Sequence, residues 1–148
     1  MLFRSPSSAA LQQKPLTAVP TDCPSPDAIS ISVKVSLPSV DSNSDAGTLE
    51  CTYFNPSVSA TALVITFGPS EGATPAEFDQ QVLAANPSAV AVPGVGDAAL
   101  YFTHQDVNPP IGNMNFLSGA VFGYVYGNLS FATQEHLTAL IADQILVP

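Results

Sequence analysis

The sequence predicts an α+β domain, a twisted antiparallel sheet of about five to six strands with two main helices packed on one face. Several short segments alternate apolar and polar residues, as half-buried strands do. Two further segments carry helix caps and helical periodicity. The connections are short, which favours antiparallel neighbours, and helices on such a sheet bury both apolar surfaces. With 148 residues and 46% hydrophobic residues, the chain is long and apolar enough to form one core.

We divide the chain into two regions. Residues 1–22 hold Pro6, Pro15 and Pro20 among small polar residues and have no apolar stretch typical of a signal peptide. We expect a flexible N-terminal arm over residues 1–22 and a single α+β domain over residues 23–148. No apolar run approaches the roughly 20 residues that span a bilayer.

The first elements of the domain carry mixed signals. Ser25-Pro26-Asp27 predicts a short helical turn, with Ser as the N-cap and Pro at the first helical position. In residues 29–37, Ile, Val and Leu alternate with Ser and Lys, and this pattern predicts a strand after the turn. Residues 41–47 are rich in Asp, Ser and Asn and predict a loop.

The middle of the chain predicts a hairpin and a helix. Thr48–Asn55 and Thr61–Phe67 alternate like paired strands, joined across residues 56–59. The sequence Thr74-Pro75-Ala76-Glu77 forms a capping box with Pro at the first helical position. A helix therefore begins there, and Asn86-Pro87 ends it.

The last third predicts three strands and a closing helix. Strands are expected over residues 98–103, 113–118 and 120–126, with a long turn-rich connection over residues 104–112. The helix is expected from about Thr133 to Leu146, because Leu137 and Ile141 fall on one apolar stripe.

The charge distribution excludes two classes of partner. The net charge is −9, and the three basic residues, Arg4, Lys14 and Lys34, all precede the main body of the domain. Nucleic acid and anionic membrane surfaces both require a cationic patch. Neither is expected to bind this chain.

Cys23 and Cys51 are the two cysteines, an even number in a small domain. A disulfide between them indicates an oxidising, extracytoplasmic compartment. The alternative is a pair of buried free thiols. Neither cysteine belongs to a Cys-x-x-Cys motif, so zinc binding and redox catalysis are disfavoured.

One segment has a partial resemblance to a metal-binding loop. Asp41, Asn43 and Asp45 present oxygen side chains at alternate positions, as calcium loops do at their start. The glycine and the closing glutamate of such a loop are out of register, so calcium is the weaker interpretation and a polar turn the stronger. No other cofactor is expected.

The candidates for catalysis are few. His104 and His136 are the only histidines, and no nucleophile motif such as Gly-x-Ser-x-Gly occurs. Gly94-Val95-Gly96-Asp97 precedes a predicted strand rather than a helix, so a tight turn explains it better than a phosphate loop. No catalytic residues are assigned, and the chain is not expected to be an enzyme.

Aromatic residues are concentrated in the predicted C-terminal strands. Phe122, Tyr124 and Tyr126 share the face opposite Val121 and Val125, and Tyr101 lies on the neighbouring strand. These four aromatic residues are the candidate interaction face, suited to a peptide, a glycan or an apolar ligand. The alternative is that they close the core or a dimer contact.

Several of these features together carry a family resemblance. They are an early Cys before a short helix, a Phe-bearing helix at Phe78, and the segments Cys51-Thr52-Tyr53, Val64-Ile65-Thr66-Phe67 and Val92-Pro93-Gly94-Val95-Gly96-Asp97-Ala98-Ala99. With them, residues 23–146 resemble the small secreted or lipid-anchored domains of unknown function of actinobacterial cell envelopes. The resemblance implies a Cys23–Cys51 disulfide and an extracytoplasmic, non-catalytic α+β domain.

The function expected from these observations is a non-catalytic extracytoplasmic binding or protein-interaction domain of the cell envelope. Its partner would be an envelope protein, a peptide or a glycan. The alternative is a structural subunit of a surface complex that buries the weakly charged aromatic face.

Overall fold

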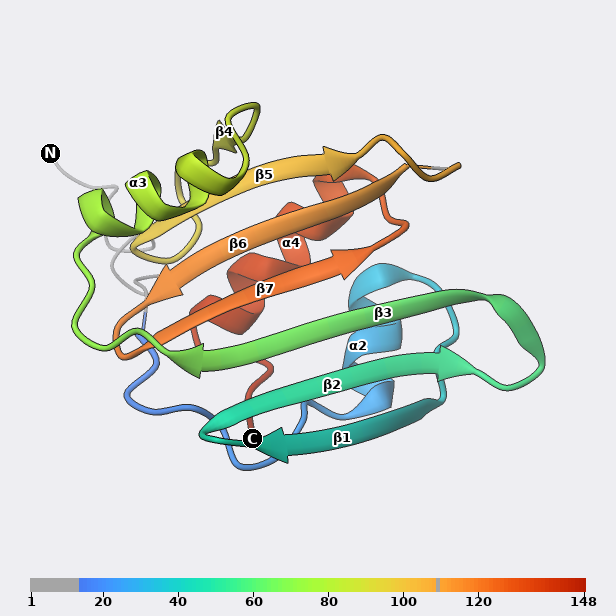
Figure 1. Cartoon of the computed structure of the whole chain (residues 1–148). Coiled ribbons are helices and arrows are strands. Elements are labelled where there is room, and N and C mark those ends of the chain that lie inside the picture. Colours follow the sequence, from blue (N-terminus) through green and yellow to red (C-terminus); the bar gives the residue numbers. More distant parts are fainter. Residues whose placement is uncertain (1–13, 109) are drawn as a thin grey trace, which may run out of the picture.

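A computed structural model of the chain describes residues 14–108 and 110–148, which form an α+β domain (Figure 1). In this part of the chain, a seven-stranded antiparallel sheet has the order β1-β2-β3-β7-β6-β5-β4. The predicted class is confirmed, with more strands and one more helix than expected. The strands are β1 (Ser39–Asp45), β2 (Thr48–Asn55), β3 (Val58–Pro69), β4 (Val90–Ala91), β5 (Ala98–His104), β6 (Ile111–Ser118) and β7 (Val121–Gly127). The helices are α2 (Pro26–Val33), α3 (Pro75–Ala85) and α4 (Phe131–Ala142).

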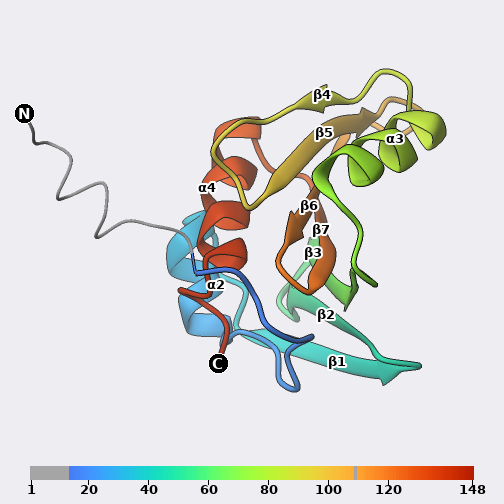
Figure 2. The same cartoon turned by 90° about the vertical axis from the view of Figure 1, so that its left-hand side faces the viewer.

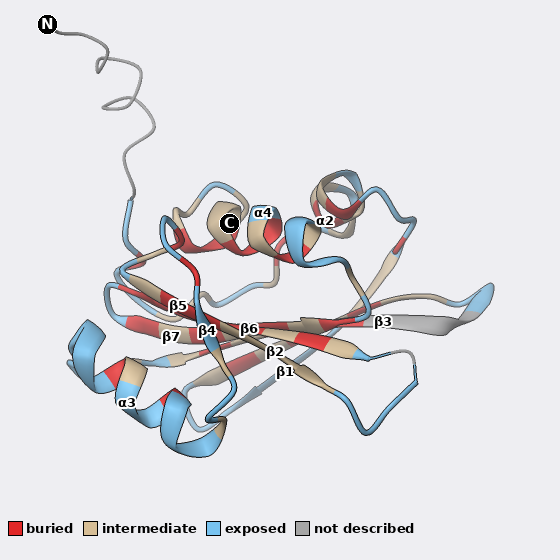
Figure 3. Ribbon diagram, turned by 90° about the horizontal axis from the view of Figure 1, so that it is seen from above, coloured by how far each residue is buried: buried red, intermediate tan, exposed pale blue. Residues whose placement is uncertain are grey.

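Helices cover both faces of the sheet (Figures 2 and 3). Helices α2 and α4 pack side by side on one face, here called the inner face, and α3 packs on the opposite, outer face. The prediction that the two main helices share one face is therefore wrong. The reason is a second apolar cluster on the outer face, where Leu100 and Leu117 of the sheet contact Phe78 and Val82 of α3.

The larger core lies between the sheet and helices α2 and α4, where buried residues line the inner face (Figure 3). Phe67 and Phe116 meet edge to face there, with ring centroids 6.5 Å apart. The buried Gln134 of α4 donates from Nε2 to the carbonyl oxygens of Gly112 and Val125, each at 3.0 Å. This side chain joins α4 to β6 and β7.

The segment after Ser25 folds as a helix and not as a strand. The Ser25 side chain accepts a hydrogen bond from the Ala28 N–H, and α2 continues to Val33. Ile29 and Val33, four residues apart, enter the core, whereas Ile31 is 77% exposed. The predicted strand alternation over residues 29–37 is wrong, because Ile29 and Val33 also satisfy the helical period.

The polar segment 41–47 is a strand and a tight turn rather than a loop. β1 pairs with β2 along its length, from Ser39 opposite Phe54 to Asp45 opposite Thr48. Ala46 and Gly47 form the two-residue turn, and both have positive φ angles, as a type I′ hairpin requires. Composition alone did not predict this strand, because five of its seven residues are exposed.

Other local predictions are confirmed. α3 has the complete capping box, in which the Glu77 N–H donates to the Thr74 hydroxyl and the Thr74 N–H donates to the Glu77 carboxylate. The hairpin of β2 and β3 and the three C-terminal strands occur within a few residues of the predicted positions. The closing helix begins and ends earlier than expected, at Phe131 and Ala142.

The described end of the predicted N-terminal arm, residues 14–22, is bound to the domain. Leu16 is buried, its N–H donates to Ser118 Oγ, and its carbonyl oxygen accepts from the Ala120 N–H. Packing therefore places the start of the domain at or before Leu16 rather than at Cys23. Residues 1–13 lie outside the described residues.

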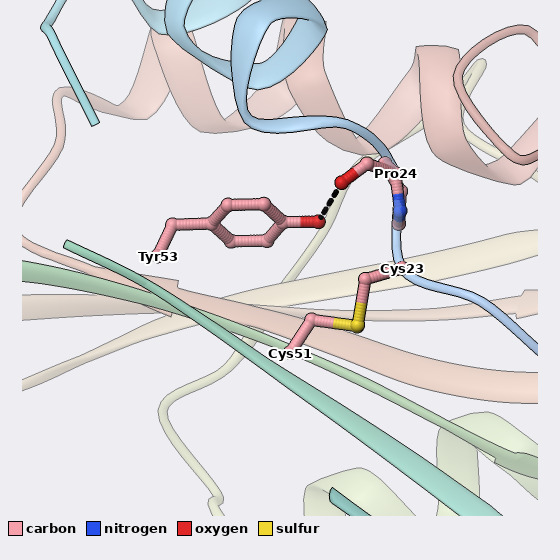
Figure 4. Close-up of a disulfide and its surroundings, with 4 residues drawn as sticks. All are labelled: Cys23, Pro24, Cys51 and Tyr53. Atoms are coloured by element: carbon pink, nitrogen blue, oxygen red, sulfur yellow. Dashed lines mark hydrogen bonds between the residues drawn. A yellow bond between two sulfur atoms is a disulfide. The ribbon is translucent and has the colours of Figure 1, made fainter. Parts of the chain in front are cut away.

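The predicted disulfide joins Cys23 to Cys51 of β2, with Cα atoms 5.8 Å apart (Figure 4). Beside it, the Tyr53 hydroxyl donates to the carbonyl oxygen of Pro24 at 2.6 Å. Burial of Tyr53 raises the pKa of its phenol well above the ordinary value. Two neighbouring residues of β2 thus hold the segment that leads into α2.

Candidate functional site

Half of the outer face of the sheet has no helix over it. Helix α3 lies over β5 and β6 and reaches β7 through the contact of Phe78 with Phe122, whereas β3, β2, β1 and the rest of β7 have no helix over them on that side (Figures 1 and 3). We call the outward-facing side chains of these four strands the open face. They include Asp41, Asn43, Asp45, Thr48, Glu50, Thr52, Val64, Thr66, Phe122, Tyr124 and Tyr126.

Strand register places these residues in rows across the sheet. In one row, Asn43 is opposite Glu50, Glu50 is opposite Thr66, and Thr66 is opposite Tyr124. The row continues through Asn115 to Leu100, where it passes under α3. Side chains opposite one another point to the same face and lie within contact distance. The open face is therefore continuous with the surface beneath α3.

Three rings meet at one end of the outer face. His104 lies 5.4 Å from Phe102 and 5.4 Å from Tyr126, measured between ring centroids, and both contacts are edge-on. All three side chains are half-buried. The cluster gives this end of the sheet a fixed aromatic surface, since each ring restricts the rotamers of its neighbour.

Two polar atoms on the outer face are buried without a hydrogen-bond partner among the described residues. They are Oγ1 of Thr66 and Nε2 of His104. An unpaired buried polar atom costs roughly 1–3 kcal/mol, because it has lost its hydrogen bonds to water.

The open face is shallow where it meets α3. A hollow of about 260 Å³ is lined by residues including Thr48, Thr66, Phe122 and Tyr124. A second hollow of about 160 Å³ lies between α3 and the sheet and shares Phe122 as a wall. Both are smaller than the typical small-molecule pocket of roughly 300–1,000 Å³. Their form fits contact with an extended ligand better than enclosure of a compact one.

The charge on the open face is negative. Asp41, Asp45 and Glu50 lie on β1 and β2, and the sequence has no Lys or Arg after Lys34. Lys34 itself ends α2 on the inner side of the sheet. The strands of the open face therefore carry carboxylates with no cationic side chain of their own to pair with.

The structure brings together three of the four predicted interface aromatics. Phe122, Tyr124 and Tyr126 follow one another on the outer side of β7. Tyr101 lies on the inner face instead, opposite Met114, where its ring meets Phe131 of α4 at 4.9 Å. Burial there raises the pKa of the Tyr101 phenol. Tyr101 is therefore not part of the open face.

Phe102, the residue next to Tyr101, occupies the outer position that was expected for Tyr101. It is opposite Asn113, which is in turn opposite Tyr126. Phe102, His104, Thr66 and Glu50 also lie on the outer face and are not among the predicted interface residues. Strand alternation shows that Tyr101 and Phe102 face opposite sides, but only the register of β5, β6 and β7 decides which one shares the face of Tyr126.

The calcium candidates lie along a straight strand. Asp41, Asn43 and Asp45 project from the same side of β1 at alternate positions. Positions two apart in a strand are separated by roughly 6.8 Å, so the two aspartates are about 13 Å apart along β1. A single Ca²⁺ ion takes its oxygen ligands at roughly 2.3–2.6 Å. These three residues therefore cannot converge on one ion while β1 stays extended.

The two histidines lie far apart in the fold. His104 ends β5 in the aromatic cluster, and His136 is exposed in α4 on the inner side. Over residues 14–108 and 110–148, no group of three or more His, Cys, Asp or Glu side chains is arranged to hold a metal ion. None of the helices in this part of the chain has the length and apolarity to cross a membrane.

Comparisons with protein-family models, with curated proteins and with solved structures find no match to this chain. The geometry of the open face is therefore the basis for assigning a function.

Proposed function

We propose that this chain is a non-catalytic binding domain of the cell envelope whose open face holds a peptide or a glycan. The observation that carries the proposal is an uncovered half sheet lined with aromatic and polar side chains. Aromatic rings such as those of Phe122 and Tyr124 supply flat contact area. Hydroxyl and carboxylate groups beside them, on Thr66 and Glu50, supply hydrogen-bonding positions.

The shape of this surface favours binding over catalysis. Catalytic sites surround the reacting atoms and exclude water from them. The hollows beside Phe122 hold about 260 Å³ and 160 Å³ and open onto the sheet surface. An extended ligand lying across β7, β3 and β2 would cover more of this surface than a compact one. This shape supports the proposed binding role.

The experiment is a binding screen on peptide and glycan arrays with the full chain, followed by two variants. Tyr124→Ser combined with Tyr126→Ser removes two of the three aromatic rings that β7 contributes to the open face and should weaken binding of any hit at least tenfold. Ile31→Ser is the matched control, because Ile31 is an exposed apolar residue of α2 on the other side of the sheet. It should leave binding unchanged.

Two outcomes would contradict the proposal. One is a ligand that binds equally well to the double tyrosine variant, which would place the binding surface elsewhere. The other is a stable dimer by sedimentation velocity that dissociates in the tyrosine variant. That result would assign the open face to the assembly role, in which a second copy or a subunit covers the aromatic residues.

We also propose that the domain works outside the cytoplasm, and the Cys23–Cys51 disulfide supports this. Both cysteines are paired, so none is free in the described chain. Mass spectrometry of alkylated protein from its native host, with and without reductant, tests the localisation. The expected result is a mass increase only after reduction. Two cysteines alkylated without reductant would overturn it.

A further inference from the structure

The two edge strands of the sheet differ in length. Strand β4, at one edge, has two residues, Val90 and Ala91, and Pro93 follows shortly after. Strand β1, at the other edge, has seven residues and pairs only with β2 in the described chain (Figure 1). A short edge offers no template to another strand, whereas a long regular one does. β1 is therefore the edge at which an eighth strand could be added.

The register of the hairpin shows which backbone N–H and C=O groups of β1 are available to hydrogen-bond with an added strand. Asp45 and Thr48 flank the two-residue turn and form the hydrogen-bonded closing pair of the hairpin. Hydrogen-bonded pairs alternate with non-bonded ones, so the backbone groups of Asp41, Asn43 and Asp45 face β2. Those of Val40, Ser42 and Ser44 point away from the sheet. These three residues form the free edge.

The side chains of β1 show which strand would fit beside it. At the free edge, Asp41, Asn43 and Asp45 occupy non-hydrogen-bonded positions relative to an incoming antiparallel strand, where facing side chains come closest. A second copy of β1 centred on Asn43 would place Asp41 of each chain opposite Asp45 of the other. Like charges directly opposite each other are destabilising. The edge therefore disfavours a second copy and favours a strand with cationic residues four positions apart.

Space for such a strand exists at the turn end of β1. A hollow of about 290 Å³ lies between residues 19–21 and the β1–β2 hairpin, with Ser44 and Gly47 in its lining. Residues 41–45 are exposed along the rest of the edge.

From this geometry we propose that the free edge of β1 accepts an extended cationic peptide as an eighth, antiparallel strand. Backbone hydrogen bonds to Val40, Ser42 and Ser44 hold the peptide, and its Lys or Arg side chains pair with Asp41 and Asp45. Strand addition of this kind takes affinity from the main chain and specificity from alternate side chains. The free edge lies on β1, whereas the rings of Tyr124 and Tyr126 that test the proposed function lie on β7, two strands away from β1's neighbour β2, so variants of each strand test the two proposals independently.

The probe is the blocked heptapeptide TKVTVKT, whose lysines are four positions apart, titrated into the ¹⁵N-labelled full chain at low salt. The amide signals of Val40, Ser42 and Ser44 should shift and become protected from hydrogen exchange. The matched peptide TEVTVET, with glutamates in place of lysines, should bind at least fivefold more weakly. Added salt should weaken binding of the lysine peptide, because the ion pairs are exposed.

Two variants test the ion pairs and the backbone hydrogen bonds separately. Asp41→Asn with Asp45→Asn keeps the strand and should lower affinity about fivefold, as expected for the loss of two exposed ion pairs. Its control, Glu71→Gln with Asp106→Asn, removes two exposed carboxylates elsewhere and should leave affinity unchanged. Ser42→Pro removes an outward N–H and no bond to β2, so it should abolish protection at the edge while the thermal midpoint stays close to the parent value.

The proposal is overturned if the shifts map to β3, β7 or α3 instead of β1. It is also overturned if both peptides bind equally, or if the control variant loses as much affinity as the Asp41/Asp45 variant. A dimer by sedimentation velocity that Ser42→Pro dissociates would show that a second copy occupies the edge, contrary to the charge argument.

Discussion

On the outer face of the sheet, β5 and β6 lie under α3, which also touches Phe122 at the start of β7, whereas β3, β2 and β1 have no helix over them. The difference lies in the outward-facing side chains. Under α3 they include the apolar Leu100 and Leu117, which pack with Phe78 and Val82. Farther from α3, in the row of Leu100, the outward-facing side chains include the polar Thr66 and Glu50.

This comparison shows why one helix covers only half a face. Burying a large apolar side chain contributes roughly 1.5–3 kcal/mol, so α3 is stabilised where it meets Leu100 and Leu117. Placing the same helix over Thr66 and Glu50 would remove polar groups from water without giving them partners. The open half therefore remains available to a ligand that brings its own polar groups.

Stability should fall most when the packing between α3 and the sheet is disrupted. Phe78→Ala should lower the free energy of unfolding by about 3 kcal/mol, since Phe78 is 2% exposed and its ring meets Phe122 edge-on at 5.4 Å. Urea denaturation measures this change. The matched variant in the open half, Tyr124→Ala, should cost less than about 1 kcal/mol. Equal losses from the two variants would mean that the halves do not differ in packing.

A smaller effect should come from the cap that begins α3. Thr74→Ala removes the hydroxyl that accepts from the Glu77 N–H and should cost about 1 kcal/mol by urea denaturation. Ser130→Ala, at the N-cap of α4, is the comparison, because its hydroxyl accepts from the Thr133 N–H in the same way. If α3 depends on its own cap more than α4 does, Thr74→Ala should cost more than Ser130→Ala.

The same cap should be pH dependent. The Thr74 backbone N–H and hydroxyl lower the pKa of Glu77 below its ordinary value of 4.5. Because the folded pKa is depressed, the stabilising contribution is present above the unfolded pKa and is lost as the pH falls through the folded one. The stability difference between the parent and Glu77→Gln should therefore shrink below about pH 4. A difference that stays constant from pH 7 to pH 3 would contradict the assignment.

A substitution in the open half should change stability least, and it should raise the free energy of unfolding rather than lower it. Thr66→Val removes a buried hydroxyl that has no partner in the described chain, so the free protein should gain up to about 1 kcal/mol. Thr52→Val, on the neighbouring strand and the same face, controls for the strand preference of Val and should gain less. If a ligand uses the Thr66 hydroxyl, Thr66→Val should stabilise the protein and weaken binding. A loss of stability instead would show that the hydroxyl is satisfied.

Local signals predicted some elements to the residue. The capping box placed the start of α3 at Pro75, because all of its hydrogen bonds form between residues three apart. Thr48–Asn55 was likewise predicted with its observed bounds, since Leu49, Cys51 and Tyr53 alternate toward one core. The disulfide followed from there being two cysteines in a small domain.

Other elements were decided by pairing and packing. Residues 29–33 satisfy both the strand and the helix period, and contact with α4 and the sheet selects the helix. β1 has a polar composition that suits a loop, and it is a strand because β2 supplies its hydrogen-bond partners. The position of Tyr101 on the inner face depends on its register with Met114.

The α+β class, the absence of Lys and Arg after Lys34 and the shared side of Phe122, Tyr124 and Tyr126 were all predictable from the sequence, whereas the position of Asp41 and Asp45 in a strand was not. Each of the predictable features depends on composition or on neighbours within a few positions. Only the tertiary structure decided which half of the outer face α3 covers and which edge of the sheet is long and free. Both depend on the order of strands far apart in the chain, with β3 beside β7, and no local pattern records that order.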